Sequence, residues 1–388
     1  MPFPLYLLAL AVFAMGTSEF MLAGLLPDIA SDLGVSVGTA STLTSAYAIG
    51  MIVGAPLMAA LARRRPGRTS LLGFVLVFLA AHVLGAATDD FAVLFAARVV
   101  AALANAGFLA VALTLAATLV PPDRKGRALA VLLSGTTVAM VAGVPGGSLL
   151  GAQFGWRATF WAVAALCLPA AIGVLTGIRP RQEQNDVSEG RALRAELALL
   201  KGRRLILVVV LAALVNAATF AGVTFLAPVV TGTAGLGELW ISVALVLFGV
   251  GSFLGVTVAG RLSDRRPGLV LAVGGPLLLI GWPASAVLAD RPVALLVLVC
   301  VQGALSFAVG GTLITRILYE AAGAPTMAGS YATAALNIGA AVGPLVAATT
   351  LTTAAGELGP LWVSGLLVAV GLFVAVPSRT VVMAGRGR

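Results

Sequence analysis

Hydrophobic side chains fill long stretches of this chain, and short polar segments separate them. An apolar run of about 18 residues or more predicts a helix that crosses a membrane. The pattern predicts an all-α integral membrane protein with twelve such spans, several longer than a bilayer requires, as tilted helices are. The predicted spans are residues 4–27, 39–62, 69–87, 91–118, 128–151, 158–178, 205–230, 240–260, 269–289, 292–316, 326–352 and 359–378.

The charges of the connecting segments alternate along the chain. Of the 24 lysines and arginines, all but Arg98, Arg157, Arg291 and Arg316 lie in segments that follow even-numbered spans. Cytoplasmic segments of membrane proteins carry an excess of Lys and Arg. The pattern therefore predicts a multi-pass protein with both termini in the cytoplasm.

One long polar segment, residues 179–204, divides the chain. We predict an N-terminal half at 1–178, this cytoplasmic linker, and a C-terminal half at 205–388. Arg-Arg-Pro-Gly occurs at 64–67 and again at 265–268, and a Pro beside Gly recurs at Pro145 and Pro344. The two offsets are nearly equal, which favours a duplicated six-helix unit. Coincidence is the alternative, because Pro is tolerated in membrane helices.

Composition excludes several other classes of protein. The chain is 60% hydrophobic and 10% charged, whereas a soluble domain carries about 25% charged residues. The net charge of +9 lies in clusters between spans, so we expect no nucleic-acid partner. Cys167 and Cys300 have no metal-binding spacing. The sole histidine, His82, has no acidic partner nearby in sequence and is interpreted as a packing or interfacial residue. Because there is no acid pair, activated nucleophile or phosphate-binding loop, we expect no enzyme, catalytic residue, metal or cofactor.

Glu19 is the only charged residue between Met1 and Asp28. An ionisable group inside a membrane span is costly and marks a functional site by default. A carboxyl group at that position can take up and release a proton. This residue indicates a transporter driven by the proton gradient rather than a passive channel.

Three segments resemble the major facilitator superfamily. They are Gly260-Arg-Leu-Ser-Asp264-Arg265, similar to the family's G-x-L-x-D-R loop motif; Arg98 in the fourth span; and Gly143-Val-Pro145-Gly146-Gly147, similar to the glycine–proline motif of drug–proton antiporters. The stretch from Gly16 to Ser36 is similar to the first span and outer loop of the chloramphenicol-resistance exporters, a branch of the twelve-span antiporters. The resemblance covers the whole chain and implies two pseudo-symmetric six-helix halves.

The resemblance also implies that spans 1 and 4 line a central cavity. Glu19 and Arg98 are predicted at similar depth, so we expect them to form the proton-coupling pair. An apolar environment favours a neutral carboxyl group, whereas a nearby arginine favours the ionised one. Movement of Arg98 would then switch Glu19 between holding and releasing a proton. A static ion pair that only fixes helix packing is the alternative.

Polar and aromatic residues inside the spans are candidates for substrate binding. Asn216 and Phe220 share a helical face in the seventh span, which faces the cavity in the resembled fold. Amides of this kind suit a neutral, amphipathic drug, and interhelical hydrogen bonding is the alternative. The candidates are Asn105, Asn216, Phe220, Gln302 and Asn337.

Other residues are expected to serve conformational change. Asp264 and Arg265 are predicted to gate the cytoplasmic side, with Asp264 capping a helix N-terminus. The matching position in the first half holds Arg63, so we expect Asp264 alone to supply this lock. Glycine and proline are expected to bend the helices of spans 5 and 11. These helix-bending residues are Gly143, Pro145, Gly146, Gly147, Gly343 and Pro344.

The combined prediction is a proton-coupled exporter of chloramphenicol or similar drugs in the bacterial inner membrane, working as a monomer within the lipid bilayer. Its halves would rock about a central site. Sister exporters of sugars and nucleosides share the first-span pattern and are the alternative.

Overall fold

The computed structural model describes residues 1–388 apart from 23–24, 64, 179–194, 238, 325 and 376–388. Every regular element in these residues is a helix, as the apolar runs predict. Most of the predicted linker lies outside the described residues. The α-helices are α1 (Phe3–Met21), α2 (Leu26–Asp32), α3 (Val37–Ala62), α4 (Gly67–Ala87), α5 (Phe91–Thr118), α6 (Lys125–Val138), α7 (Val144–Phe154), α8 (Trp156–Gly177), α10 (Arg203–Thr224), α11 (Leu226–Pro228), α12 (Leu239–Arg265), α13 (Pro267–Val287), α14 (Pro292–Glu320), α15 (Ala328–Ala348) and α16 (Gly359–Ala375).

Eleven helices among the described residues are long and apolar enough to cross a membrane. They overlap the predicted spans two to twelve, with boundaries shifted by a few residues. The first predicted span, 4–27, is shorter than expected: α1 ends at Met21, and its apolar part is Phe3–Glu19. A total of twelve spans therefore stays a prediction.

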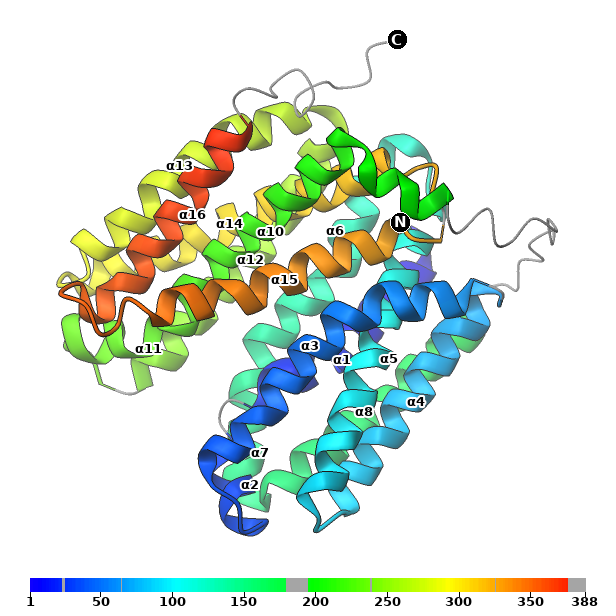
Figure 1. The fold of residues 1–388 in the computed structure, drawn as a ribbon, viewed down its shortest axis with the longest axis horizontal. Coiled ribbons are helices and arrows are strands. Elements are labelled where there is room, and N and C mark those ends of the chain that lie inside the picture. The colour runs from blue at the N-terminus through cyan, green and yellow to red at the C-terminus, as the bar shows by residue number, and fades with distance from the viewer. Residues whose placement is uncertain (23–24, 64, 179–194, 238, 325, 376–388) are drawn as a thin grey trace. The chain divides into compact units, whose positions relative to one another are not determined.

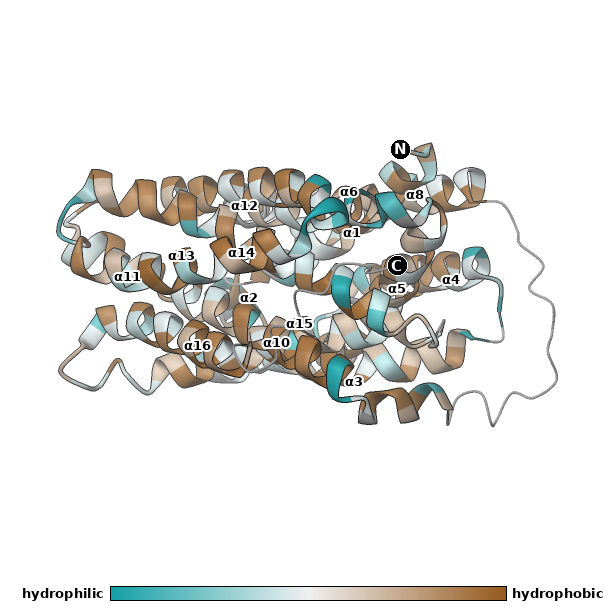
Figure 2. Ribbon diagram, turned by 90° about the horizontal axis from the view of Figure 1, so that it is seen from above, coloured by the Kyte–Doolittle hydropathy of each residue, from teal (hydrophilic) through white to brown (hydrophobic). Residues whose placement is uncertain are grey.

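The surface of the helices is apolar along much of their length. Figure 2 shows hydrophobic residues along the helices and hydrophilic residues gathered mainly at their ends and connections. Large side chains such as Leu345, Val293 and Phe373 are 70%, 77% and 81% exposed. Water would make such exposure costly, so these side chains suit contact with lipid.

One compact unit comprises residues 1–120, 131–197 and 324–334. Within it α3 packs along α5, α4 contacts both α5 and α8, and α1 contacts α8 (Figure 1). Asp90 is the N-cap residue of α5: its Oδ1 accepts from the backbone N–H groups of Ala92 and Val93 at 2.6 and 3.2 Å. This cap satisfies donors that the helix cannot pair internally.

A second compact unit comprises residues 121–130, 198–323 and 335–388. In it α12 packs along α14, α10 contacts α14 and α16, and α13 contacts both of those helices. A cavity of about 300 Å³, lined by residues of apolar types, lies among α10, α13, α14 and α16. The predicted division into halves at 178 and 205 stays a prediction.

Glycines allow close helix contacts where the sequence predicts bending. A Cβ added to Gly143 would lie 3.2 Å from the Cα of Thr17, and one on Gly147 would lie 2.9 Å from Met21. Both glycines therefore let α1 approach the fifth predicted span. No atom lies within 4 Å of the corresponding point on Gly146, so close packing does not require a glycine there.

The two predicted proline positions differ in their surroundings. The fifth predicted span is not one regular helix, because a π-helical turn, η3 (Ala139–Gly143), separates α6 from α7. α7 follows this turn directly, and Pro145 is its second residue. Such turns are irregularities at which helices bend. Pro344 lies inside α15, next to Gly343, whose added Cβ would overlap the Ala217 carbonyl oxygen of α10.

Candidate functional site: a buried arginine cluster beside Glu19

Arg98 is the centre of a buried polar cluster in the first unit. Its side chain is 1% exposed. Nη1 donates to Ser18 Oγ at 2.7 Å, and Nη2 donates to the Ser18 carbonyl oxygen at 3.4 Å. The guanidinium carbon lies 4.2 Å from the centroid of the Tyr47 ring. A buried cation needs such partners, and α1 and α3 supply them to α5.

His82 extends this cluster, and the partners of its two ring nitrogens define its tautomer. Its Nδ1 lies 2.8 Å from the Phe78 carbonyl oxygen, which only accepts, so Nδ1 carries a proton. Its Nε2 lies 2.6 Å from Ser18 Oγ. Because Ser18 Oγ already accepts from Arg98, its own hydrogen is free to be donated to Nε2. The chain of donors therefore runs from Arg98 through Ser18 and His82 to Phe78.

Asn105 closes the other side of the cluster. Its Nδ2 donates to the Tyr47 hydroxyl oxygen at 2.9 Å, and both side chains are buried. Arg98 and Asn105 stand seven residues apart on α5, so one helical face presents both to Tyr47. The predicted substrate residue Asn105 thus makes an interhelical hydrogen bond in this structure.

Glu19 directly follows Ser18 in α1. Its side chain is half-buried, and Arg98 acts on it electrostatically. The ion pairs within 4.0 Å among the described residues do not include Glu19 with Arg98. Arg98 is instead bonded to Ser18. The carboxyl group of Glu19 is therefore near the positive charge of Arg98 without forming an ion pair with it.

The remaining predicted substrate residues lie in the second unit. Asn216 of α10 donates to the Leu336 carbonyl oxygen of α15 at 2.6 Å. Phe220, one turn later, is half-buried, and Asn337, next to Leu336, is buried. Gln302 is fully buried and donates to the Leu278 carbonyl oxygen at 3.3 Å. It joins α14 to α13, so it belongs to a different helix contact from Asn216.

Asp264 lies at the end of α12, and its carboxylate caps α6. Its Oδ1 accepts from the Gly126 N–H at 2.6 Å, and its Oδ2 accepts from the Arg127 N–H at 3.2 Å. These donors belong to the first turn of a helix, where an anion is favoured. Arg265, the second predicted gating residue, is exposed.

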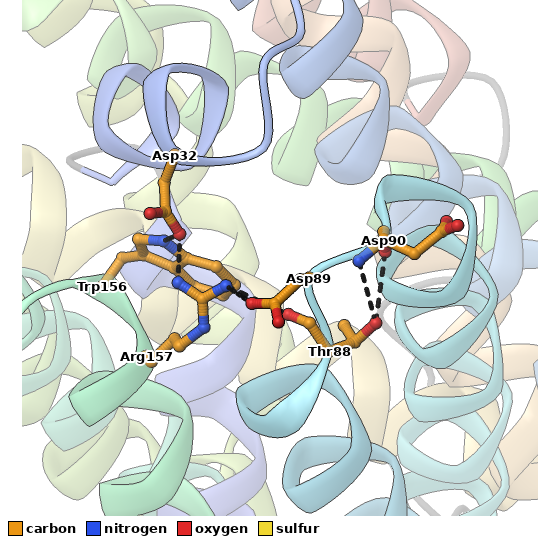
Figure 3. Close-up of polar contacts among 6 residues, drawn as sticks. All are labelled: Asp32, Thr88, Asp89, Asp90, Trp156 and Arg157. Carbon is orange, nitrogen blue, oxygen red and sulfur yellow. Dashed lines mark hydrogen bonds and ion pairs between the residues drawn. The ribbon is translucent and has the colours of Figure 1, made fainter.

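Arg157 joins three segments of the first unit (Figure 3). It forms ion pairs with Asp32 of α2 and, at 2.6 Å, with Asp89 of the connection between α4 and α5. Its Nη2 also donates to the Thr88 carbonyl oxygen at 3.1 Å. Trp156 donates from Nε1 to Asp32 at 3.0 Å. Within the part of the chain described, no group of three His, Cys, Asp or Glu side chains is placed to hold a metal ion.

Arg157→Gln is expected to destabilise the protein slightly and in a pH-dependent way. The hydrogen bond from Arg157, and then that from Trp156, holds the pKa of the Asp32 carboxyl below its usual value of 3.8. A depressed pKa contributes stability above pH 3.8 that is lost as the pH falls through the folded-state pKa. Because Asp32 and Asp89 are 45% and 92% exposed, we expect about 0.2–1 kcal/mol at pH 7.

The measurement is the melting temperature of the detergent-solubilised protein between pH 7 and pH 3. The difference between wild type and Arg157→Gln should shrink towards zero at the acid end. Arg291→Gln removes an exposed arginine that forms no ion pair among the described residues, and it is the matched control. An equal loss of stability in both variants would contradict the role given to the ion pairs.

Sequence reasoning missed three members of the Arg98 cluster. Ser18, Tyr47 and His82 are residue types common in membrane helices, and nothing local marks them as partners of Arg98. His82 is not only a packing residue, because it accepts from Ser18 in the donor chain. The one available signal was the position of Ser18 directly before Glu19.

The sequence model of the Major Facilitator Superfamily matches residues 8–344. The chain belongs to the major facilitator superfamily. As a member it is a transporter rather than an enzyme, and its many apolar helices make it a multi-pass membrane protein.

This transporter is similar to proteins that cover nearly its whole length. It is 76% identical over 382 residues to a chloramphenicol resistance protein of Streptomyces lividans, covering 98% of this chain and 97% of the relative. It is 31% identical to the inner membrane transport protein YdhP of Escherichia coli K12, covering 91% and 90%. The crystal structure of the superfamily transporter FucP in the outward conformation shares the fold, with a TM-score of 0.77, 15% identity and 98% of each chain covered.

Proposed function

We propose that this transporter exports chloramphenicol in exchange for protons and thereby confers resistance. The observation that carries the proposal is the 76% identity, over 98% of the chain, to a chloramphenicol resistance protein. The half-buried Glu19 supports proton coupling, because it is the only charged residue of α1. The protein would act as a monomer in the bacterial inner membrane, with both termini in the cytoplasm.

The Arg98 cluster supplies a mechanism for coupling. Ser18 and Tyr47 hold the Arg98 guanidinium near Glu19 but not on it. Protonation removes the charge of Glu19 and its attraction to Arg98, so uptake of a proton favours one conformation and its release the other. In alternating access, drug leaves as protons enter from outside. Net charge moves if the drug is neutral, so transport responds to membrane potential.

The substrate contacts proposed for a neutral drug combine amide and aromatic groups. Asn216 Nδ2 donates to the Leu336 carbonyl oxygen. Its side-chain oxygen is then left to accept from a hydroxyl or amide of the drug. Phe220 lies one turn away and offers a ring for stacking. The buried Gln302 Oε1 has no hydrogen-bond partner in the part of the chain that the structure describes, and it is a second acceptor. Asn105 and Asn337 complete the proposed set.

The test combines resistance and transport. The chain is expressed in a drug-sensitive host, and growth is profiled with chloramphenicol, related phenicols, sugars and nucleosides. In inverted membrane vesicles, an imposed proton gradient should drive saturable accumulation of chloramphenicol. Accumulation of a sugar or nucleoside without the drug would favour the sister exporters. Drug flux that never exceeds equilibration would indicate a channel.

Asp264→Asn is expected to slow transport without removing drug binding. Asparagine can still accept through one oxygen, but it loses the charge that the first turn of α6 favours. A cap of this kind typically contributes about 1 kcal/mol, so a transport rate reduced about fivefold is expected. Unchanged rates in inverted vesicles, with unchanged chloramphenicol affinity, would contradict the gating assignment. Asp290→Asn, the same acid-to-amide change at an exposed residue that forms no ion pair among the described residues, is the matched control.

A further inference from the structure

Glu196 makes a contact that neither the family resemblance nor the transport mechanism uses. It lies in a helical turn, residues 195–198, at the end of the predicted linker. Its side chain is 8% exposed. One carboxylate oxygen, Oε2, accepts from the backbone N–H groups of Thr326 and Met327 at 3.1 and 3.0 Å. These are the residues immediately before α15, so Glu196 caps that helix.

The contact has the same form as the one made by Asp264. Thr326 and Met327 stand 200 residues after Gly126 and Arg127, the two donors to Asp264. That offset lies between the two offsets of the sequence repeats. Equivalent helix starts in the two repeats therefore each present two backbone donors to one carboxylate. An anion at such a helix start pairs donors and interacts favourably with the helix dipole.

The acids themselves do not occupy equivalent positions. Asp264 precedes the second Arg-Arg-Pro-Gly segment, whereas Arg63 precedes the first. An arginine cannot accept from backbone N–H groups. Asp264 is the only acid at these two loop positions, and Glu196 supplies a second capping carboxylate from the end of the linker.

Other groups hold the start of α15 in the same place. The Tyr331 hydroxyl donates to the Glu196 carbonyl oxygen at 2.8 Å, so both the side chain and the backbone of Glu196 accept hydrogen bonds from the start of α15. The Gly329 N–H donates to Thr114 Oγ1 of α5 at 3.1 Å. A Cβ on Gly329 would overlap the Ala110 carbonyl oxygen of α5, so α15 approaches α5 closely here. The Glu196 cap thus forms where the start of α15 is seated on α5.

We propose that Glu196 is a positioning residue of the transport cycle, a linker-borne latch that holds the start of α15 on α5 and replaces the acid absent at residue 63. The latch rests on the proposed alternating-access function. It closes in the state described here and opens when α15 leaves α5. The linker is then part of the gating machinery as well as a connection between the predicted halves.

Cysteine accessibility tests the latch without drug or proton gradient. Ser330 of α15 is fully buried, and Ser330→Cys, in a Cys167→Ala/Cys300→Ala background, reports whether the start of α15 is covered. Labelling by a membrane-impermeant maleimide is measured in inverted vesicles. Glu196→Ala should raise the labelling rate about fivefold, the change expected for loss of a typical capping acid. Glu196→Gln keeps the size and one acceptor oxygen, so its rate should lie between those of the parent and of Glu196→Ala.

The matched control is Glu320→Ala. Glu320 ends α14, is half-buried and forms no ion pair among the described residues, so its removal changes the charge but no cap. It should label at the parent rate. Parent rates for both Glu196 variants, with unchanged melting temperature, would overturn the latch. The outcome does not depend on which drug is carried or on proton coupling, so failure of the proposed function would leave a distinct signature, normal latch behaviour without chloramphenicol transport.

Discussion

Replacing Glu19 with Gln is expected to abolish proton-driven chloramphenicol accumulation in inverted vesicles, to the background of vesicles without the transporter. Glutamine retains the size and hydrogen-bonding capacity of the side chain but cannot bind and release a proton. The half-buried carboxyl group beside Arg98 is the ionisable group of α1, and an intramembrane acid is retained for function because it is otherwise costly. Expression and thermal stability should be preserved.

Counterflow separates loss of coupling from loss of binding. Exchange of labelled for unlabelled chloramphenicol at equal pH needs no net proton movement, so Glu19→Gln should retain it. Glu320→Gln provides the matched acid-to-amide change outside the Arg98 cluster and should transport normally. Gradient-driven accumulation at the wild-type level in Glu19→Gln would remove Glu19 from the coupling mechanism.

Replacing Arg98 with Lys is expected to reduce transport severely although the positive charge is kept. The guanidinium donates from two nitrogens to the two Ser18 acceptors while its face lies over Tyr47. A lysine ammonium cannot reproduce this planar fork. Loss of one hydrogen bond made by a charged group costs about 1.5–3 kcal/mol, so initial rates should fall about tenfold or more.

Tyr47→Phe and Ser18→Ala separate the contributions of the two partners of Arg98 to transport. Phenylalanine keeps a ring for the cation and loses only the bond from Asn105, so transport should fall much less than in Arg98→Lys. Ser18→Ala removes the hydroxyl that links Arg98 to His82 and should approach the Arg98→Lys rate. Wild-type rates in both Arg98→Lys and Ser18→Ala would show that the geometry of the cluster is irrelevant to coupling.

Most of the helical architecture was predictable from the sequence. Apolar runs long enough to cross a bilayer identify helices from composition and length alone, because an unpaired backbone is intolerable in lipid. Eleven candidate spans therefore agree with the prediction. The error at the first span has a local cause. Hydropathy continues through Leu22, Leu25 and Leu26, but apolar character does not decide where hydrogen bonding of a helix stops.

Glu19 stood out by local pattern alone, and the resemblance to family motifs also pointed to Arg98 and Asp264. A lone acid or arginine within apolar surroundings, or a lone acid among arginines, is visible without a structure. Their partners were not visible. Ser18 and Tyr47 contact Arg98 from two other helices, and His82 joins through Ser18 from a third. The sequence does not show which faces of these helices pack together.

Glu196 shows most clearly which contacts the sequence could not predict. In the sequence it is one acid in a polar linker, and the repeat offset directs attention to residue 63, where an arginine stands. Only the tertiary structure brings its carboxylate to the N–H groups before α15, 130 residues further along the chain. Hydropathy and charge are properties of each segment by itself, so they can be evaluated from the sequence alone. Caps and buried hydrogen bonds depend on which segments pack together, and packing is decided by the whole fold.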